Sequence, residues 1–216
     1  MTDLRHLPQV TQAVGTAAVI VAAGAGRRLG GVAKALLPYR GTTYLATIAA
    51  TARAVGLVDA VVVVGEPFGD DVAAHARQLG LRVRVNPAPG RGMASSVALG
   101  FAAIANGPAQ AAWLWPVDHP AVMESTLRQL VDAFAASGAL EDLPSGGPIV
   151  VQPRHAGRGG HPPLCSRALW PKLALCAGEP DGARGVLRAA RLVAVDVDDP
   201  GVVHDIDTPA DLEARA

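Results

Sequence analysis

Residues 17–34, AAVIVAAGAGRRLGGVAK, decide the fold, because an apolar run passes directly into a glycine-rich, basic loop. The unbroken run over residues 17–22 predicts a central parallel strand that is buried on both faces. The glycines of the loop let backbone N–H groups approach an anion closely, and Arg27, Arg28 and Lys34 add positive charge. The stretch therefore predicts a phosphate-binding loop, and its charge suits a triphosphate.

Strand and helix patterns alternate along the chain as far as residue 137. After the first strand, further strands are expected at residues 60–64, 81–85 and 111–115. Helices are expected at residues 43–55, 70–79, 94–105 and 124–136. This alternation predicts a doubly wound α/β fold, with a mainly parallel sheet and helices on both of its sides.

The stretch 138–165 breaks the alternation, because it is rich in glycine and proline. We expect it to form a small excursion that folds over the open edge of the sheet and contacts a ligand, with one strand at residues 149–152. A helix at residues 181–190, a strand at 191–197 and a helix that begins at Thr208 complete the prediction.

The composition describes one ordered domain. The chain has 216 residues, of which 50% are hydrophobic and 18% are charged, so a disordered chain is excluded. We expect a short leader at residues 1–15 and a single domain over residues 16–216. The 19 basic and 19 acidic residues give a formal net charge of zero, and no apolar run reaches the roughly 18–20 residues of a membrane span. Neither nucleic acid nor a membrane is therefore an expected partner.

Cysteine usage and the first residues of the chain favour a cytoplasmic location. Cys165 and Cys176 match no zinc or redox motif, and they fit a reducing compartment in which they fill space. The first residues contain no apolar segment of the kind that a secretory signal requires.

Two common phosphate-binding motifs fit the loop poorly. The dinucleotide fingerprint requires G-x-G-x-x-G, whereas Gly24, Gly26 and Gly30 are spaced as G-x-G-x-x-x-G. It also requires an acidic residue about 20 positions later, and Glu66 comes far too late for that spacing. The P-loop requires Ser or Thr directly after its lysine, and Lys34 is followed by alanine. A nicotinamide dehydrogenase is therefore a weak alternative.

The loop instead resembles the signature of the nucleotidylyltransferases, in which A-A-G-x-G-x-R-L-G is followed by Lys and Leu-Leu-Pro. In that family the loop surrounds the phosphates of a nucleoside triphosphate, which implies a Rossmann-like nucleotidylyltransferase fold here. The resemblance assigns Arg28 and Lys34 to catalysis. It assigns to nucleotide binding these two and Ala22, Ala23, Gly24, Ala25 and Gly26.

A second segment, NPAPGRGMASSVALG at residues 86–100, resembles a motif of the molybdenum cofactor cytidylyltransferase branch of the MobA-like superfamily. In that branch the segment lies beside the base and ribose, which implicates Asn86, Gly92, Ser95 and Ser96. The two serines are expected in the first turn of a helix, where unpaired N–H groups can meet a polar ligand. Capping of the helix by Ser95 is the alternative.

Asp118 is the first candidate metal ligand. It follows the expected strand 111–115, and ligands of parallel sheets bind outside the carboxyl ends of the strands. Mg²⁺ prefers carboxylate and phosphate oxygens, so Asp118 is also a candidate catalytic residue. The family pattern here is D-x-P, usually with Gln or Met in the middle, whereas this chain has His119. That departure leaves the surroundings of the metal and the substrate preference open.

The closing segment HDIDTPADL, residues 204–212, resembles the last motif of the family. Alternation places Asp205 and Asp207 on the same side of an extended segment, so either can complete the magnesium site. We assign Asp207 as the second ligand. Its alternative role is to cap the following helix.

Two further segments resemble acceptor-side motifs of the same branch. Residues 157–164, GRGGHPPL, match G-x-x-G-H-P, and residues 178–184, GEPDGAR, resemble G-D-x-G-A-R with an extra residue. Arg158, His161 and Arg184 are therefore expected to bind an anionic acceptor. Zinc binding by histidines here is disfavoured because no third ligand is evident.

These motifs together imply Mg²⁺-dependent transfer of CMP from CTP to the phosphate of molybdopterin cofactor, with release of pyrophosphate. The Ala22-Ala23-Gly24 sequence favours CTP, although the spacing from Gly30 to Lys34 is closer to the guanylyltransferase pattern. A GTP-dependent or other nucleotidylyltransferase that acts on a sugar phosphate or another phosphorylated metabolite is the alternative enzyme. A nucleotide-binding sensor without activity is the alternative outside enzymes.

Overall fold

The computed structural model describes residues 14–138 and 147–206, and it contains one large sheet. The strands of this sheet lie in the order β10-β7-β9-β6-β1-β4-β5, with β8 paired to β7. Most of the expected leader, residue Asp207 and the helix expected at Thr208 lie outside the described residues. Within the described ranges, no helix combines the length and apolar character that crossing a membrane requires.

The first part of the chain alternates as predicted. Its elements are β1 (Thr16–Val21), α1 (Tyr44–Arg53), β4 (Leu57–Val64), α2 (Gly69–Gln78), β5 (Arg82–Val85), α3 (Met93–Ile104), β6 (Ala111–Pro116) and α4 (Glu124–Ala136). A short hairpin of β2 (Pro38–Tyr39) and β3 (Thr42–Thr43) precedes α1 and was not predicted. Thr43 caps α1, because its Oγ1 accepts a hydrogen bond from Ala46 N at 3.1 Å.

The remaining elements show that the predicted excursion after residue 138 is wrong. They are β7 (Ile149–His155), β8 (Arg158–Gly159), β9 (Leu164–Ser166), α5 (Trp170–Leu175), α6 (Gly182–Arg188) and β10 (Arg191–Asp196). Instead of leaving the sheet, this part of the chain extends it, because β9 inserts antiparallel between β6 and β7 and β10 pairs parallel to β7. Of the strands described in this part of the chain, β8 lies off the row and pairs antiparallel with β7.

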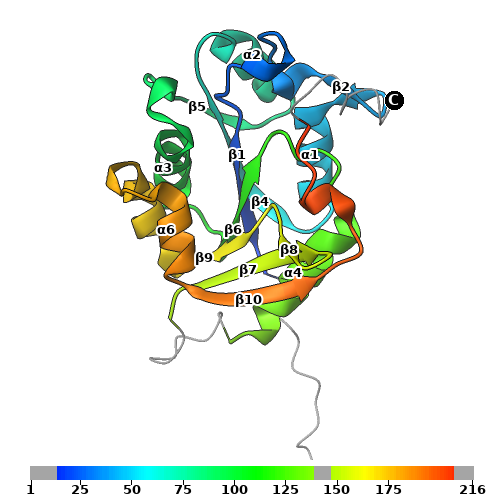
Figure 1. Ribbon diagram of the computed structural model, residues 1–216, viewed down its shortest axis with the longest axis vertical. Helices are drawn as coiled ribbons and strands as arrows, with labels where there is room; N and C mark the ends of the chain where they lie inside the picture. The colour runs from blue at the N-terminus through cyan, green and yellow to red at the C-terminus, as the bar shows by residue number, and fades with distance from the viewer. Residues whose placement is uncertain (1–13, 139–146, 207–216) are drawn as a thin grey trace, which may run out of the picture.

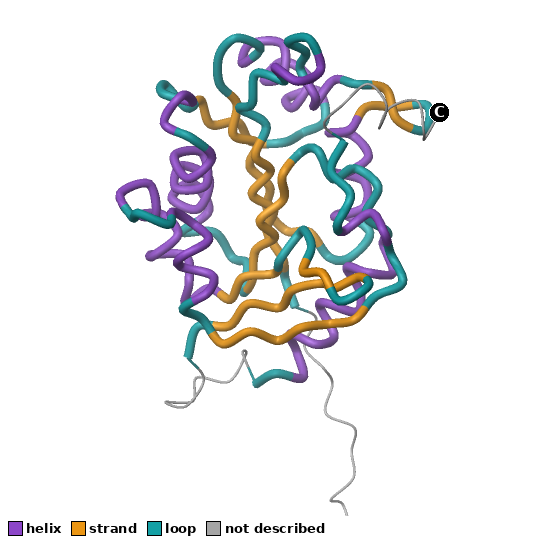
Figure 2. Tube along the Cα trace, in the orientation of Figure 1, coloured by secondary structure: helices purple, strands orange, loops and turns teal. Residues whose placement is uncertain are grey.

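Helices cover both faces of the sheet. Side chains of α1, α2 and α4 form one buried cluster with one face, and side chains of α3, α5 and α6 form a second cluster with the other. Figure 1 shows α3 and α6 on one side of the sheet and α1 and α4 on the other. The trace in Figure 2 shows the strong twist of the sheet, in which β7 and β10 cross the direction of β1. The fold is therefore doubly wound and mainly parallel, as predicted.

The order of the strands reverses beside β1. From β1 the chain first adds β4 and β5 on one side, and it then returns to place β6 on the other side. In open α/β sheets such a reversal leaves a crevice at the carboxyl ends of the strands. Here that crevice lies between the ends of β1 and β6, at Val21 and Pro116. Helix α3 packs closely against β1 at Gly100, where any side chain would collide with Val19.

Candidate active site

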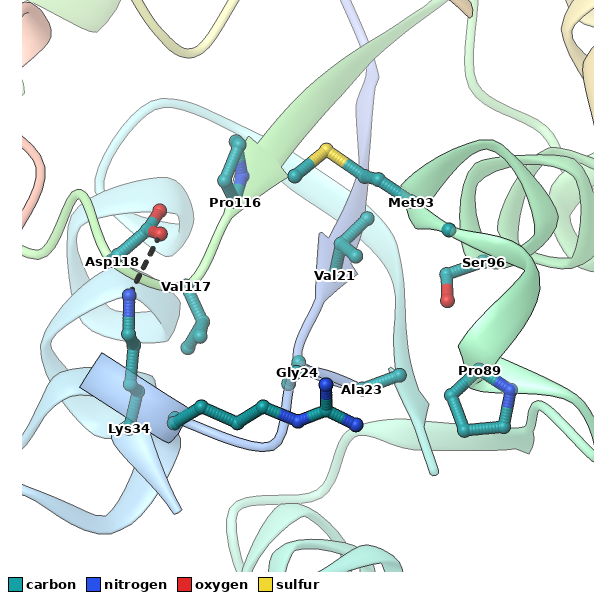
Figure 3. Close-up of a pocket in the computed structure, with 14 residues that line it drawn as sticks. Val21, Ala23, Gly24, Lys34, Pro89, Met93, Ser96, Pro116, Val117 and Asp118 are labelled. Atoms are coloured by element: carbon teal, nitrogen blue, oxygen red, sulfur yellow. Dashed lines mark hydrogen bonds and ion pairs between the residues drawn. The ribbon is translucent and has the colours of Figure 1, made fainter. Parts of the chain in front are cut away.

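A cavity of about 360 Å³ lies at the carboxyl ends of β1 and β6 (Figure 3). Its charged lining residues, within the described part of the chain, are Arg27, Lys34 and Asp118. Figure 3 shows the Lys34–Asp118 pair on one side of the cavity and Ser96 on the opposite side. The lining residues are Val21, Ala22, Ala23, Gly24, Gly26, Arg27, Lys34, Pro89, Gly92, Met93, Ser96, Pro116, Val117 and Asp118. We call this space the first cavity.

The glycine-rich loop curves tightly around Gly26. Gly26 has φ of 56°, and its carbonyl accepts hydrogen bonds from Leu29 N at 2.9 Å and Gly31 N at 3.0 Å. A side chain at this position would collide with Val32 O, so only glycine fits the turn. The turn places Arg27 against the first cavity, whereas the side chain of Arg28 lies outside the described part of the structure.

Lys34 and Asp118 form an ion pair at the wall of the first cavity. Lys34 begins a 3₁₀ turn (Lys34–Leu36), and its Nζ lies 3.2 Å from Oδ2 of Asp118. Both side chains are mostly buried, with 15% and 22% of their surfaces exposed. Oδ1 of Asp118 is buried and has no hydrogen-bond partner among the described residues. The pair therefore joins two of the three predicted catalytic side chains and leaves one carboxylate oxygen available to bind a cation.

His119 lies directly beside this carboxylate. Its ring is buried, with Nε2 3.9 Å from Oδ1 of Asp118 and Nδ1 3.3 Å from Gly201 O. Ile206 N donates to Asp118 O at 3.0 Å. The start of the closing motif therefore runs against Asp118, with exposed Asp205 next to the contact. Asp207, the residue assigned as the second metal ligand, follows Ile206 in the sequence and lies outside the described residues.

Asn86 organises the start of α3 from inside the protein. Asn86 is 2% exposed, and its Nδ2 donates to Oγ of Ser95 at 2.8 Å and of Ser96 at 2.9 Å. Ser95 Oγ also donates to Gly92 O at 2.7 Å. Of these predicted nucleotide-binding residues, Gly92 and Ser96 line the first cavity. Asn86 and Ser95 instead fix the helix end on which Ser96 stands.

A second cavity of about 670 Å³ lies beside the first, and Met93 lines both. His161 and Arg184, which the sequence suggested as acceptor-binding residues, line it, and Gln152, Asp181 and Arg188 add further polar groups. Much of its wall is apolar, from Met93, Ala94, Val97, Leu114, Val150, Ala183, Leu187 and Leu192. Arg158 is exposed on β8 and does not belong to the described lining of this cavity.

His161 links the second cavity to His119. Their ring centroids are 5.0 Å apart, and Nδ1 of His161 is buried without a hydrogen-bond partner in the described structure. Burial lowers the pKa of His161 to about 4, and the neighbouring His119 adds to this effect. Above pH 5, His161 is therefore a neutral polar group rather than a cation.

A third cavity of about 510 Å³ lies on the other side of the glycine-rich loop, and Glu66 lines it together with residues 23–27. Its distance from the loop in the sequence had excluded Glu66 as the acidic residue of a dinucleotide-binding fingerprint. Structurally it follows β4, which is the immediate neighbour of β1, so the end of β4 comes beside the loop. The long distance in sequence arises because the β2–β3 hairpin and α1 lie between the two strands.

The cavities divide the predicted site residues whose side chains are described. The first cavity is lined by Ala22, Ala23, Gly24, Gly26, Lys34, Gly92, Ser96 and Asp118, and the second by His161 and Arg184. Ala25 lines the third cavity, while Asn86, Ser95 and Arg158 line none of the three as they are described. Arg27 was named only for its charge, and Met93 and Glu66 were not predicted as lining residues. Met93 belongs to the quoted motif, but the sequence did not show that its side chain is exposed to the cavities.

Comparisons with known proteins show the family of this chain. A family model described as the MobA-like NTP transferase domain matches residues 18–195. Nicotine blue oxidoreductase of Paenarthrobacter nicotinovorans is 34% identical over 196 residues, which cover 88% of this chain and 91% of that protein.

Solved structures of another protein resemble this chain over most of its length. The crystal structure of Rv0371c from Mycobacterium tuberculosis H37Rv is similar to this chain with a TM-score of 0.70 and 30% identity, covering 94% of this chain and 97% of that one. A structure of Rv0371c in complex with manganese has a TM-score of 0.62 and 27% identity, covering 93% of this chain and 97% of that one. Since the family match spans more than half of the chain, the chain belongs to the MobA-like NTP transferase family and is a nucleotidyltransferase.

Proposed function

We propose that this protein transfers CMP from CTP to the phosphate of molybdopterin cofactor and releases pyrophosphate, with a divalent cation, Mg²⁺, bound at Asp118. The observation that carries this proposal is the pair of adjoining cavities that share Met93. The first has a glycine-rich loop and the Lys34–Asp118 pair, which suit a triphosphate, and the second has Arg184, which suits an anionic acceptor. Two phosphorylated substrates can therefore meet between them.

The chain contributes position and charge rather than a nucleophile. An oxygen of the acceptor phosphate attacks the α-phosphorus of CTP, the bond from this phosphorus to the bridging oxygen breaks, and pyrophosphate leaves with the electron pair. Such a transfer depends mainly on alignment and on neutralisation of charge. Backbone N–H groups of the loop, Arg28 and Lys34 would hold the triphosphate, and Ser96 would contact the nucleoside from the opposite wall. Arg184 would hold the acceptor phosphate.

The buried, unpartnered Oδ1 of Asp118 is the feature that fits a divalent cation. Among the described residues, no three His, Cys, Asp or Glu side chains are grouped to hold a metal alone. That suits Mg²⁺, which is commonly bound by one or two carboxylates together with substrate phosphates and water. The bound cation would supply charge neutralisation at the α-phosphate. Asp207, or Asp205 next to Ile206, would be the second carboxylate, and the manganese complex of Rv0371c supports a divalent ion in a relative.

The character of the second cavity favours molybdopterin cofactor over a sugar phosphate. A sugar presents a hydroxyl group on almost every carbon, and each needs a hydrogen-bond partner when it is buried. The polar residues that line the second cavity, Gln152, His161, Asp181, Arg184 and Arg188, are outnumbered by apolar side chains. A flat heteroaromatic ring with a phosphate suits such a wall better, because its faces are apolar and its edge is polar.

A panel of nucleotides tests the proposal. CTP, GTP, ATP and UTP are incubated with the full chain, Mg²⁺ and molybdopterin cofactor, and pyrophosphate and product mass are measured. CTP is expected to give the largest kcat/KM and a product of the cofactor plus CMP. Product with GTP alone, or with a sugar phosphate alone, would select the alternative enzyme, and CTP binding without any product would indicate a sensor.

Replacement of Asp118 tests the metal assignment within the same assay. Asp118→Asn keeps the size of the side chain but removes the charge that a cation requires, so kcat should fall by about 1,000-fold or more. Asp132→Asn, at an exposed position of α4, is the matched control and should keep native activity. Unchanged pyrophosphate release by Asp118→Asn would contradict the assignment.

One specific observation favours a second candidate, an oxidoreductase that uses a nicotinamide dinucleotide. Glu66 follows the strand next to β1 and shares the third cavity with the glycine-rich loop. In dinucleotide-binding folds an acidic residue at the end of this neighbouring strand binds the ribose hydroxyls. The relative from Paenarthrobacter nicotinovorans is itself named an oxidoreductase. We rank this candidate second because the spacing of the loop glycines departs from the dinucleotide-binding fingerprint.

Binding of NADH separates the two candidates. NADH should leave the melting temperature unchanged if the protein is only a nucleotidyltransferase. An increase in melting temperature with NADH that is lost in Glu66→Gln, together with no pyrophosphate release from any triphosphate, would replace the first proposal with the second.

A further inference from the structure

We infer that His119 is a ligand of the divalent cation, in addition to Asp118, and that the site therefore binds Mn²⁺ more tightly than Mg²⁺. This inference rests on the part of the proposed function that places a cation at Asp118. It adds a nitrogen ligand to a site that the motifs describe with carboxylates alone. His119 is also the residue at which this chain departs from the D-x-P pattern of the family, which usually has Gln or Met there.

The hydrogen bonding of His119 identifies the atom that would bind the ion. Nδ1 lies 3.3 Å from the carbonyl oxygen of Gly201, which can only accept a hydrogen bond. In the neutral ring Nδ1 therefore carries the hydrogen, and Nε2 keeps its lone pair. Histidines that bind metals commonly donate their other ring N–H to a backbone carbonyl in this way, which fixes both tautomer and ring orientation.

Two atoms that can bind a cation lie close together on neighbouring side chains. Nε2 of His119 lies 3.9 Å from Oδ1 of Asp118, and that oxygen is buried with no hydrogen-bond partner among the described residues. A buried carboxylate oxygen without a donor is unfavourable unless a cation or water lies beside it. Metal–ligand bonds to imidazole or carboxylate are each about 2.0–2.2 Å, so one ion can reach atoms that are roughly 4 Å apart.

The surrounding structure holds both atoms in place. The ring of His119 is 6% exposed and packs against His161, with 5.0 Å between the ring centroids. Trp115 Nε1 donates to His119 O at 3.0 Å, and Gly201 belongs to a segment that buried Asp199 anchors. Since Asp118 lines the first cavity and His161 lines the second, an ion at this position would lie between the two reacting phosphates.

The ligand set predicts which ion binds. Mg²⁺ strongly prefers oxygen ligands, whereas imidazole nitrogen suits ions of the first transition series. One nitrogen next to one carboxylate therefore favours Mn²⁺ over Mg²⁺ without excluding Mg²⁺. Mg²⁺ can still support activity because it is far more abundant than Mn²⁺ in cells.

Mn²⁺ binding to the full chain provides a test that does not depend on turnover. Free Mn²⁺ is measured by EPR with Mn²⁺ alone and with α,β-methylene-CTP, an analogue that cannot be cleaved, and Mg²⁺ is then added as a competitor. The variants are His119→Gln and His119→Met, two side chains of similar length without an imidazole. His75→Gln is the matched control, because His75 lies on α2 and bonds Thr43 Oγ1 at 2.8 Å.

We expect the Kd for Mn²⁺ to rise about tenfold or more in both His119 variants, with a much smaller change for Mg²⁺ and none in His75→Gln. Pulsed EPR of bound Mn²⁺ should show a ¹⁴N coupling that both His119 variants lose. A native complex without ¹⁴N coupling, or equal weakening of both ions, would overturn the inference even if CMP transfer occurs. Native binding of both ions by Asp118→Asn would instead remove the cation from the proposed function, and the inference with it.

Discussion

Lys34 is the residue whose contacts we expect to change when a nucleotide binds. In the structure its Nζ contacts Oδ2 of Asp118 at 3.2 Å, and both groups lie at the wall of the first cavity. A divalent cation at Asp118 would compete with this contact, and the triphosphate would offer Lys34 a new anionic partner. Under the proposed function, Lys34 would therefore balance the charge of Asp118 until the substrate brings its own cation and phosphates.

Replacement of Lys34 by alanine tests this role. The loss of a charge-assisted hydrogen bond of about 1.5–3 kcal/mol should raise the Kd for CTP with Mg²⁺ by about 10- to 100-fold, as measured by isothermal titration calorimetry. Lys172→Ala, at an exposed position of α5, is the control and should bind CTP as the native protein does. An unchanged Kd for Lys34→Ala would exclude Lys34 from the site.

The sequence predicted single residues well where a motif and a strand end coincide. Asp118 was predicted from its position after an apolar strand, and the structure places it at the cavity. Glu66 was missed because the prediction counted residues along the chain, whereas its position depends on which strands are neighbours. The surroundings of His119 could not be predicted, because Gly201 and His161 reach it from segments more than 40 residues away.

Among the secondary-structure elements, the 3₁₀ turn Arg27–Leu29 that follows β1 and the loop before α4 have the greatest influence on the site. The first shapes the glycine-rich loop around Gly26, and the second holds Asp118 against the closing segment. Each is fixed by one residue that cannot be exchanged without loss. For Gly26 the constraint is backbone conformation, and for Asp199, which anchors the second loop, it is hydrogen bonding.

Gly26→Ala tests the constraint at the first turn. The left-handed backbone and the collision with Val32 O should together reduce the free energy of unfolding by about 3 kcal/mol, as measured by urea denaturation. Gly24→Ala is the matched control, since a side chain there meets nothing within 4 Å, and it should change stability by less than about 0.5 kcal/mol. Equal stability of the two variants would contradict this account of the loop.

Asp199→Asn tests the second loop. Oδ2 of Asp199 accepts from Met123 N at 2.8 Å and Thr126 Oγ1 at 2.7 Å, and Oδ1 accepts from Gly201 N at 2.9 Å. An amide can satisfy only one side of this arrangement, so the free energy of unfolding should fall by about 2 kcal/mol or more in urea denaturation. Exposed Asp198→Asn should have no such effect. A loss of similar size in Asp198→Asn would show that net charge, not the hydrogen bonds, is responsible.

At the scale of elements, the regular part of the chain was predictable and the irregular part was not. Helix α4 has the predicted bounds, because its apolar residues repeat at helical spacing and pack on one face. Strand β9 has three residues, which carry no periodic signal. Its place between β6 and β7 depends on two partners that are distant in sequence, so the glycine- and proline-rich composition around it suggested an excursion instead.

In the whole molecule, two apolar layers enclose the sheet and bury both cysteines. Burial raises the pKa of the Cys165 thiol to about 12, and burial also raises the pKa of Cys176. At about pH 8 both groups are therefore thiols rather than the reactive thiolates. Access to them requires opening of the layer formed by α3, α5 and α6.

Thiol labelling can therefore report on the integrity of the whole fold. With an aromatic disulfide reagent at about pH 8, native protein should react at least about 100-fold more slowly than protein in concentrated guanidinium chloride, where both cysteines react. The Cys165→Ser and Cys176→Ser variants assign each reaction. Rapid labelling of Cys165 in the native protein would contradict the packing described here.

The wall that Met93 contributes to both cavities has a consequence for the end of the catalytic cycle. Under the proposed function each substrate would occupy one cavity, whereas the product would join both halves through a new pyrophosphate bridge and would be held at both ends. Dissociation then requires two sets of contacts to break together, since a half that detaches is kept nearby by the other and rebinds. Departure of the product is thus the step most exposed to slowing, and uncleavable bridged dinucleotides are the compounds best suited to block the enzyme.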